Sequence, residues 1–279
     1  MTTPAPPAAS ANPKPVTLRT LRKRVADGTP IPVLTAYDAT TAHWLAEGGI
    51  DVLLVGDSAG QLILGHPSTI HAPLPFLLEL TAAVKRGAPH AFVIGDLPFG
   101  SYHESPAQAI RNCTKFLTRG HADAVKLEVG PGQLETLHAL TDAGIPALAH
   151  LGFKPQHTQM TGSPTVAGKT AADRDKLVTL AQQCQAAGAV MLLLEATTAE
   201  AAQAVLDNTT LPVIGCGAGP HCHGHVVVLH DLLGLSPRQP AFAPPFTDGG
   251  PRLAKLAAQW HQHITSRDYL ADGGPYHMT

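Results

Sequence analysis

The chain has 279 residues, of which 44% are apolar and 14% are charged, and its formal net charge is −2. Such a chain can bury one sizeable core, and its charge argues against nucleic acid or an anionic membrane as a partner. No apolar stretch approaches the roughly 20 residues that span a bilayer, and the N-terminus lacks the layout of a signal peptide. We therefore expect a protein of the cytoplasm.

The cysteine spacing and the composition of the N-terminal tail allow two further predictions. The four cysteines have no Cys-x-x-Cys spacing, so we expect reduced thiols. They are Cys113, Cys184, Cys216 and Cys222. Residues 1–15 are rich in Pro, Ala and Thr and nearly lack large apolar side chains, which predicts a disordered tail. Residues 16–279 are predicted to form a single domain that ends in a helix.

From residue 16 onward, helical stretches alternate with short apolar runs that are typical of buried strands. Strands are predicted at 31–36, 52–55, 91–95, 124–128, 146–150, 190–194, 212–215 and 226–229. Helices are predicted at 16–25, 40–47, 74–85, 106–119, 133–143, 173–187, 199–206 and 252–264. The connection at 151–170 is rich in Gly, Pro and Thr and unusually long, so it is a candidate lid.

A strand followed by a helix, repeated about eight times over roughly 220 residues, predicts a (β/α)₈ barrel, also called a TIM barrel. An open, doubly wound α/β sheet remains an alternative. No Gly-x-Gly-x-x-Gly motif follows the first predicted strand, which argues against a dinucleotide-binding version of that sheet.

Titratable side chains stand at the carboxyl ends of five successive predicted strands. They are Asp57, Asp96, Glu128, His150 and Glu195. One acid in such a place is an ordinary helix cap, but capping does not explain five in succession. In a barrel these strand ends form the face that carries the active site. Lys126 precedes Glu128 by two residues on a strand, so both side chains can enter the barrel mouth together.

Three carboxylates at one mouth would repel one another unless a cation joined them, and oxygen ligands suit Mg²⁺. The waters that Mg²⁺ keeps can be replaced by a chelating substrate, and Lys126 would offer a positive charge to a substrate carboxylate. Glu195 lies on a later strand and is available as a general base. Spacing alone also allows the reverse, with Glu195 as ligand and Glu128 as base.

Several short motifs run in order from about Thr17 to Leu235. They include LTAYD at 34–38, VGDS at 55–58, DLPF at 96–99, VKLE at 125–128, HLG at 150–152 and LPVIGCGAG at 211–219. Together they resemble the ketopantoate hydroxymethyltransferase family, also called 3-methyl-2-oxobutanoate hydroxymethyltransferase. The resemblance implies a barrel of the phosphoenolpyruvate/pyruvate type in a homo-oligomeric enzyme of pantothenate and coenzyme A biosynthesis.

The resemblance further implies Mg²⁺ and transfer of a hydroxymethyl group from 5,10-methylenetetrahydrofolate to 3-methyl-2-oxobutanoate. The product would be 2-dehydropantoate, formed through a Mg²⁺-stabilised enolate. By the same resemblance, the metal ligands are Asp57, Asp96 and Glu128. The residues expected to contact the oxo acid are Asp57, Ser58, Asp96, Lys126 and His150. Glu195 would accept the proton, which decides between the two assignments left open above.

The chain departs from the family pattern outside these positions. Within the lid, residues 164–169 read PTVAGK and lack an expected glutamine, and residues 223–225 read HGH in place of Asp-Gly-Gln. Residues 71–75 and 242–246 also differ, and Leu80 stands where a histidine would align. These changes concern folate binding, the lid and subunit contacts. The histidine-rich run at 221–225 matches no structural zinc spacing and predicts a polar loop.

Two other functions remain open. One is a Mg²⁺-dependent carbon–carbon lyase or transferase acting on another 2-oxo acid, because a metal-bound enolate serves many reactions on this scaffold. The other is a catalytically silent paralogue with a role in assembly. The second is disfavoured because a silent copy would have no need of the acids and the lysine at the strand ends.

Overall fold

The computed structural model describes residues 14–236 and 238–276. Most of the predicted disordered tail, residues 1–13, lies outside the described residues, and Lys14 and Pro15 are exposed. Internal contacts divide the chain into two compact units, Met1–Val227 and Val228–Thr279. The single domain expected for 16–279 stays a prediction.

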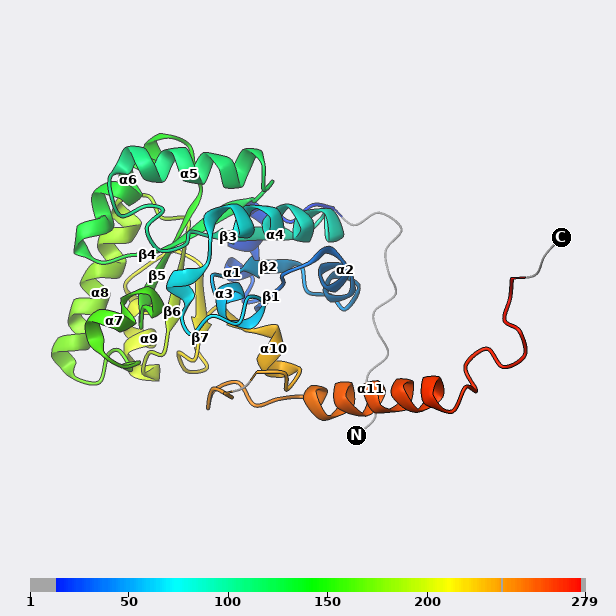
Figure 1. The fold of residues 1–279 in the computed structure, drawn as a ribbon. Helices are drawn as coiled ribbons and strands as arrows, with labels where there is room; N and C mark the ends of the chain where they lie inside the picture. Colours follow the sequence, from blue (N-terminus) through cyan, green and yellow to red (C-terminus); the bar gives the residue numbers. More distant parts are fainter. Residues whose placement is uncertain (1–13, 237, 277–279) are drawn as a thin grey trace. The chain divides into compact units, whose positions relative to one another are not determined.

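The first unit holds a closed barrel of eight parallel strands that follow one another in sequence order (Figure 1). The strands are β1 (Ile31–Thr35), β2 (Val52–Val55), β3 (Phe92–Asp96), β4 (Ala124–Glu128), β5 (Ala147–Gly152), β6 (Met191–Glu195), β7 (Val213–Cys216) and β8 (Gly224–Val227). Pairing of Ile31 with Gly224 and of Val33 with Val226 closes the barrel between β1 and β8. The predicted barrel is confirmed, and the open sheet is wrong.

Helices follow most of the strands. In the first unit they are α1 (Leu18–Ala26), α2 (Ala39–Glu47), α3 (Ala59–Leu62), α4 (Leu74–Gly87), α5 (Pro106–Thr118), α6 (Leu134–Asp142), α7 (Thr158–Thr161), α8 (Ala171–Ala186) and α9 (Ala199–Asp207), with 3₁₀ turns η1 (Thr69–His71), η2 (Pro131–Gln133) and η3 (Pro155–His157). As predicted, α5 begins with Pro106 after Ser105, whose hydroxyl accepts a hydrogen bond from the Gln108 amide at 3.2 Å. The turns and four-residue helices were not predicted, because elements of about one helical turn are too short for an apolar pattern to repeat within them.

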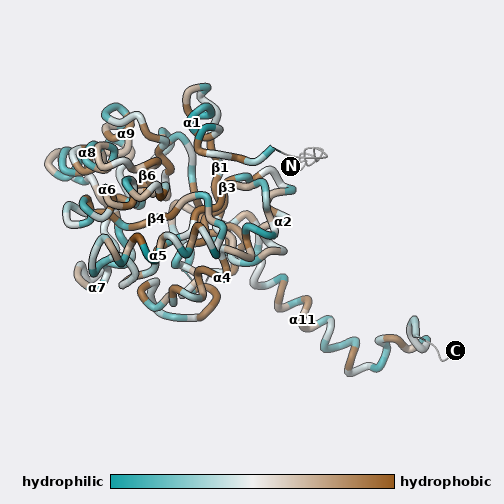
Figure 2. The backbone as a smooth tube through the Cα atoms, turned by 90° about the horizontal axis from the view of Figure 1, so that it is seen from above, coloured by the Kyte–Doolittle hydropathy of each residue, from teal (hydrophilic) through white to brown (hydrophobic). Residues whose placement is uncertain are grey.

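Alternation along each strand separates two apolar layers. One cluster gathers the inward residues, such as Leu54, Ile94, Leu148 and Leu193. The intervening positions pack against the helices, and Figure 2 shows brown, apolar strands among helices that change between teal and brown along their turns. The inward series continues toward the carboxyl ends of the strands, where polar residues replace apolar ones.

The second unit contains α10 (Leu229–Leu232) and α11 (Gly249–Thr265). The helix predicted at 252–264 is therefore confirmed and begins three residues earlier than expected. No side chain of α11 is buried, and the rings of Trp260 and Tyr269 lie edge to face with centroids 4.7 Å apart. Among the residues that the structure describes, no helix is both long and apolar enough to cross a membrane.

Close packing of α2 against α4 generates a stability prediction at Gly87. A Cβ on Gly87 would lie 2.0 Å from the Ala39 carbonyl oxygen, whereas a Cβ on Gly132 would meet nothing within 4 Å. We expect Gly87→Ala to lower the free energy of unfolding by about 1–3 kcal/mol, because the helices must separate. Gly132→Ala should change it by less than about 0.5 kcal/mol. Urea denaturation measures both, and equal stability of the two variants would contradict this packing.

Candidate active site

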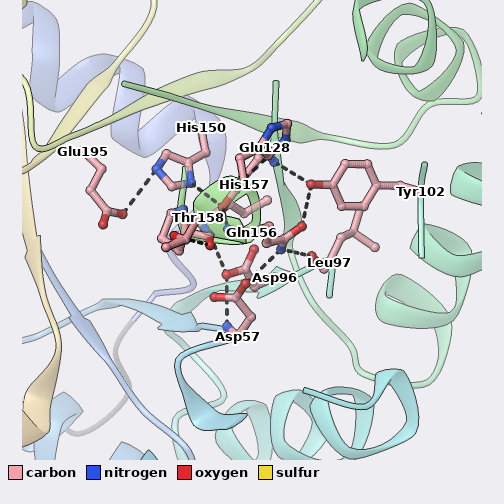
Figure 3. A network of polar contacts seen from close by, with 12 residues as sticks. Asp57, Asp96, Leu97, Tyr102, Glu128, His150, Gln156, His157, Thr158 and Glu195 are labelled. Carbon is pink, nitrogen blue, oxygen red and sulfur yellow. Dashed lines mark hydrogen bonds and ion pairs between the residues drawn. The ribbon is translucent and has the colours of Figure 1, made fainter. Parts of the chain in front are cut away.

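The acids and the histidine predicted for the barrel mouth lie near one another at the carboxyl ends of the strands (Figure 3). Asp57 follows β2, Asp96 ends β3, Glu128 ends β4, His150 lies within β5 and Glu195 ends β6. The first four are at most 5% exposed, and the Glu195 side chain is 22% exposed. Asp96, His150 and Glu195 each follow an inward apolar residue by two positions, which explains why they share the barrel interior.

Lys126 supplies the buried positive charge of the site. Its ammonium group forms an ion pair and hydrogen bond with Asp96 Oδ2, and both side chains are buried. Burial alone would lower the pKa of Lys126, but the attraction of Asp96, Asp57 and Glu128 raises it overall, so the lysine stays charged. Burial also raises the pKa of Asp96, against the opposing effect of Lys126.

Glu128 is the second carboxyl group whose ionisation is disfavoured here. Burial raises its pKa to about 8, although a hydrogen bond from the Gln156 backbone and the charge of Lys126 both oppose the rise. The Glu128 carboxylate lies 3.9 Å from His157 Nε2 through Oε2 and 4.0 Å from His150 Nδ1 through Oε1. One lysine therefore faces three neighbouring acids, which leaves an excess of negative charge once all of them ionise.

The donor atoms of the site fit a hard cation. Within residues 14–236 and 238–276, no group of three or more His, Cys, Asp or Glu side chains is arranged to hold a metal as it stands. Asp57 Oδ2 and Asp96 Oδ2 are already engaged, by Gln156 and by Lys126. Two buried oxygens, Asp96 Oδ1 and Glu128 Oε2, have no hydrogen-bond partner among the described residues. Mg²⁺ commonly uses one or two carboxylates and completes its shell with water and substrate, so these oxygens suit it.

Glu195 and His150 form the other half of the site. Glu195 Oε2 lies 3.3 Å from His150 Nε2, without the alignment of a good hydrogen bond. Burial lowers the pKa of His150, which keeps the imidazole neutral at neutral pH. Gly152 is paired with Glu195 across the sheet, and a Cβ there would lie 2.3 Å from the Glu195 carbonyl oxygen. With φ at +88°, this position requires glycine.

Ser58 lies beside the first carboxylate. Its hydroxyl is 2.8 Å from the Tyr37 hydroxyl, and Tyr37 is buried. The Asp57 backbone N–H donates to Asp96 Oδ2 at 3.1 Å, so the end of β2 and the end of β3 are joined directly. Ser58 is only partly buried and can present its hydroxyl to a ligand.

Sequence reasoning missed two residues of the site, Gln156 and Tyr102. Gln156 lies in η3 within the predicted lid, and its amide Nε2 donates to Asp57 Oδ2 at 2.8 Å. The Tyr102 hydroxyl, from the loop after β3, donates to Gln156 Oε1 at 2.8 Å. Neither residue follows a strand directly, so strand-end spacing could not identify them. The useful signal was a Pro-Gln pair three residues after the HLG motif.

Further along the predicted lid, Ala167 forms backbone hydrogen bonds with the segment that follows Glu195. The Ala167 backbone N–H donates to the Ala196 carbonyl at 2.8 Å, and the Thr198 N–H donates to the Ala167 carbonyl at 3.1 Å. Its role as a lid stays a prediction. The polar loop predicted at 221–225 is wrong in its second half, because Gly224 and His225 pair with β1 as part of β8. His223 Nδ1 accepts a hydrogen bond from the Val213 N–H at 3.0 Å, which joins this segment to β7.

Comparison with known proteins decides the family. A family model described as Ketopantoate hydroxymethyltransferase matches residues 15–272. The chain belongs to the ketopantoate hydroxymethyltransferase family. Family membership and the enzyme class predicted from the motifs are therefore confirmed at the level of the family.

Relatives of this ketopantoate hydroxymethyltransferase family member carry the name 3-methyl-2-oxobutanoate hydroxymethyltransferase. The relative from Ignicoccus hospitalis is 38% identical over 260 residues, covering 93% of this chain and 98% of its own length. The relative from Gloeobacter violaceus is 41% identical over 250 residues, covering 89% and 96%. The relative from Geobacillus thermodenitrificans is 44% identical over 205 residues, covering 74% of each chain.

Solved structures share the barrel fold of this ketopantoate hydroxymethyltransferase family member. 2,3-Dimethylmalate lyase, a member of the PEP mutase/isocitrate lyase superfamily, aligns with a TM-score of 0.59 at 17% identity and covers 95% of this chain and 92% of its own. Phosphonopyruvate hydrolase, solved with oxalate and Mg²⁺, aligns with a TM-score of 0.60 at 13% identity and covers 94% and 92%. At such identities the likeness establishes the fold alone.

The raised pKa of Glu128 predicts how the metal-free chain responds to pH. Between the ordinary carboxyl pKa and about 8, the folded chain holds a proton that the unfolded chain has lost, so rising pH lowers stability. In chelator, we expect the wild type to lose about 2 kcal/mol relative to Glu128→Gln between about pH 5.5 and 7.5.

Urea denaturation at a series of pH values measures this difference. The matched control is Glu135→Gln, which changes an exposed acid on α6 and should leave the pH dependence of the wild type unchanged. If the free energies of unfolding of the wild type and of Glu128→Gln changed equally with pH, the raised pKa of Glu128 would be contradicted.

Proposed function

We propose that the chain transfers a hydroxymethyl group from 5,10-methylenetetrahydrofolate to 3-methyl-2-oxobutanoate and yields 2-dehydropantoate for pantothenate biosynthesis. The observation that carries the proposal is the grouping of Asp96, Lys126 and Glu128 with His150 and Glu195 at one barrel mouth. Relatives named 3-methyl-2-oxobutanoate hydroxymethyltransferase support it. A cytoplasmic location and a homo-oligomeric state are further predictions of the same proposal.

Asp57, Asp96 and Glu128 would hold Mg²⁺ in this proposal. When bound, Mg²⁺ supplies positive charge where negative charge develops on the 2-oxo group. The two unpartnered carboxylate oxygens support this role. Phosphonopyruvate hydrolase, which has the same fold, was solved in complex with the small dicarboxylate oxalate and Mg²⁺.

Lys126 and Ser58 bind the oxo acid. Lys126 stays charged because three acids surround it, so its ammonium group can exchange part of its contact with Asp96 for the substrate carboxylate. The Ser58 hydroxyl, held by Tyr37, adds a hydrogen bond to the same substrate. Asp57, Asp96 and His150 line the remaining side of this pocket, and Glu195 lies beside His150.

Glu195 is the general base. It removes the proton from C3 of the oxo acid, and the electron pair of that C–H bond becomes the enolate. His150 Nε2 lies 3.3 Å from this carboxylate, and because the imidazole is neutral it leaves the charge of Glu195 in place. C3 of the enolate then forms a bond to the methylene carbon of the folate, and the bond from that carbon to one folate nitrogen breaks. Water replaces the second folate nitrogen on the same carbon, and the two nitrogens take up the proton from Glu195 and the proton released by the water. The complete reaction consumes one water molecule, which supplies the hydroxyl oxygen, and releases tetrahydrofolate.

Product formation tests this function and the role of Glu195 together. Purified chain with Mg²⁺, 3-methyl-2-oxobutanoate and 5,10-methylenetetrahydrofolate should produce 2-dehydropantoate, detected by mass spectrometry. Glu195→Gln should lower the rate by at least about 10²-fold, because proton abstraction limits the reaction, while substrate binding is retained. Glu200→Gln, at an exposed acid of α9, should retain the wild-type rate.

The outcomes separate the remaining functions. Product that depends on folate supports the hydroxymethyltransferase, and a wild-type rate in Glu195→Gln would contradict its role as base. Reaction of the oxo acid without folate would indicate a lyase or transferase with another acceptor. No reaction of the oxo acid under any of these conditions would favour the silent paralogue.

A further inference from the structure

Gln156 is buried in a place where buried polar side chains are unusual. It lies in the connection between β5 and α8 and is only 3% exposed. Connections normally run over the surface, where a glutamine side chain would be solvated. A buried amide in such a segment must find partners for its two N–H groups and its oxygen, since an unsatisfied polar group costs about 1–3 kcal/mol.

Every polar group that Gln156 directs into the site has a partner. Its backbone N–H donates to Glu128 Oε1 at 3.0 Å, and its side-chain Nε2 donates to Asp57 Oδ2 at 2.8 Å and to the Leu97 carbonyl at 2.9 Å. Its Oε1 accepts from the Tyr102 hydroxyl at 2.8 Å. One residue therefore joins the ends of β2, β3 and β4, although it is 99 positions from Asp57 in the sequence.

The chemistry of these partners fixes the orientation of the amide. The Leu97 carbonyl can only accept a hydrogen bond, and an ionised Asp57 carboxylate is also an acceptor. The NH₂ end must face them, and the oxygen must face Tyr102. Tyr102 also receives the Glu128 backbone N–H at 3.3 Å, so the same hydroxyl supports both Gln156 and the strand that carries Glu128.

We propose that Gln156 is a positioning residue that selects which oxygen of Asp57 and which oxygen of Glu128 face the cation. Gln156 engages Asp57 Oδ2 and Glu128 Oε1, so the oxygens that it leaves for a cation are Asp57 Oδ1 and Glu128 Oε2. Glu128 Oε2 is buried, has no hydrogen-bond partner among the described residues and lies 3.9 Å from His157 Nε2. Gln156 brings no charge, so it orders two acids without competing with the cation. The inference rests on the metal role proposed for Asp57 and Glu128.

Binding of Mn²⁺, followed by electron paramagnetic resonance, tests the proposal on the full chain. Gln156→Met keeps the length of the side chain and removes its hydrogen bonds, and it should raise the Mn²⁺ Kd about 10- to 100-fold, as loss of an outer partner of a metal ligand typically does. The control is Gln185→Met. Gln185 accepts hydrogen bonds from Thr210 at 2.7 and 3.2 Å, away from the strand-end acids, and this change should leave the Kd within about twofold.

A second variant covers the case in which Gln156→Met fails to fold. Tyr102→Phe removes the hydroxyl that holds Gln156 Oε1 and should raise the Mn²⁺ Kd in the same direction by about threefold. The melting temperature of each variant in chelator is measured alongside. A purely structural role would lower the melting temperature and leave the Kd of the folded protein unchanged.

The possible results distinguish this inference from the proposed function. If the wild type binds Mn²⁺ and the folded Gln156 and Tyr102 variants bind it within twofold of the wild type, the positioning role is wrong and the metal site stands. Tighter Mn²⁺ binding by either variant than by the wild type would also contradict the positioning role. If the wild type binds no Mn²⁺, both the metal role of the acids and the positioning role are wrong.

Discussion

The buried ion pair between Lys126 and Asp96 is the interaction on which the site depends. A lysine this deep in a barrel is costly unless acids compensate it, and here Asp57 and Glu128 add to the pairing with Asp96. The compensation exceeds one charge, because three acids face one lysine. Burial raises the pKa of Asp96 and of Glu128, and the charges of the neighbouring acids raise both further. Additional positive charge would offset this excess, and the divalent cation proposed above would supply it.

The barrel explains how these charges gather without disrupting the core. Inward positions of the strands are apolar deeper in the barrel and become ionisable at the carboxyl ends, as in the step from Ile94 to Asp96 and from Leu148 to His150. The charged layer thus lies on an apolar layer and opens to ligands at the mouth. Side chains from irregular connections also hydrogen-bond to this charged layer, as Gln156 does to Asp57.

Strand periodicity made the barrel and its ionisable residues predictable. A buried parallel strand is a recognisable apolar run, and the residue two positions beyond its last inward member must face the mouth, as Glu195 does after Leu193. The eighth strand was placed two residues late because Gly224 and His225 have little strand character by themselves, and pairing with β1 determines their conformation.

Contacts between irregular segments could not be predicted in this way. Gln156 and Tyr102 meet across the site from two loops, and their pairing depends on backbone paths that have no sequence period. Strand spacing alone also could not decide which of Glu128 and Glu195 is the metal ligand and which is the general base. Glu128 lies buried near Lys126, and Glu195 lies more exposed beside a neutral His150, which agrees with a ligand and a base respectively.

Exchange of the C3 hydrogen of 3-methyl-2-oxobutanoate in D₂O, followed by NMR without folate, tests the central claim most directly. A metal-dependent base at this barrel mouth should exchange the hydrogen when Mg²⁺ is present and should stop doing so when a chelator removes the metal. Absence of exchange by folded chain with Mg²⁺, or an equal rate in chelator, would contradict the claim that the cluster and Glu195 together generate the enolate.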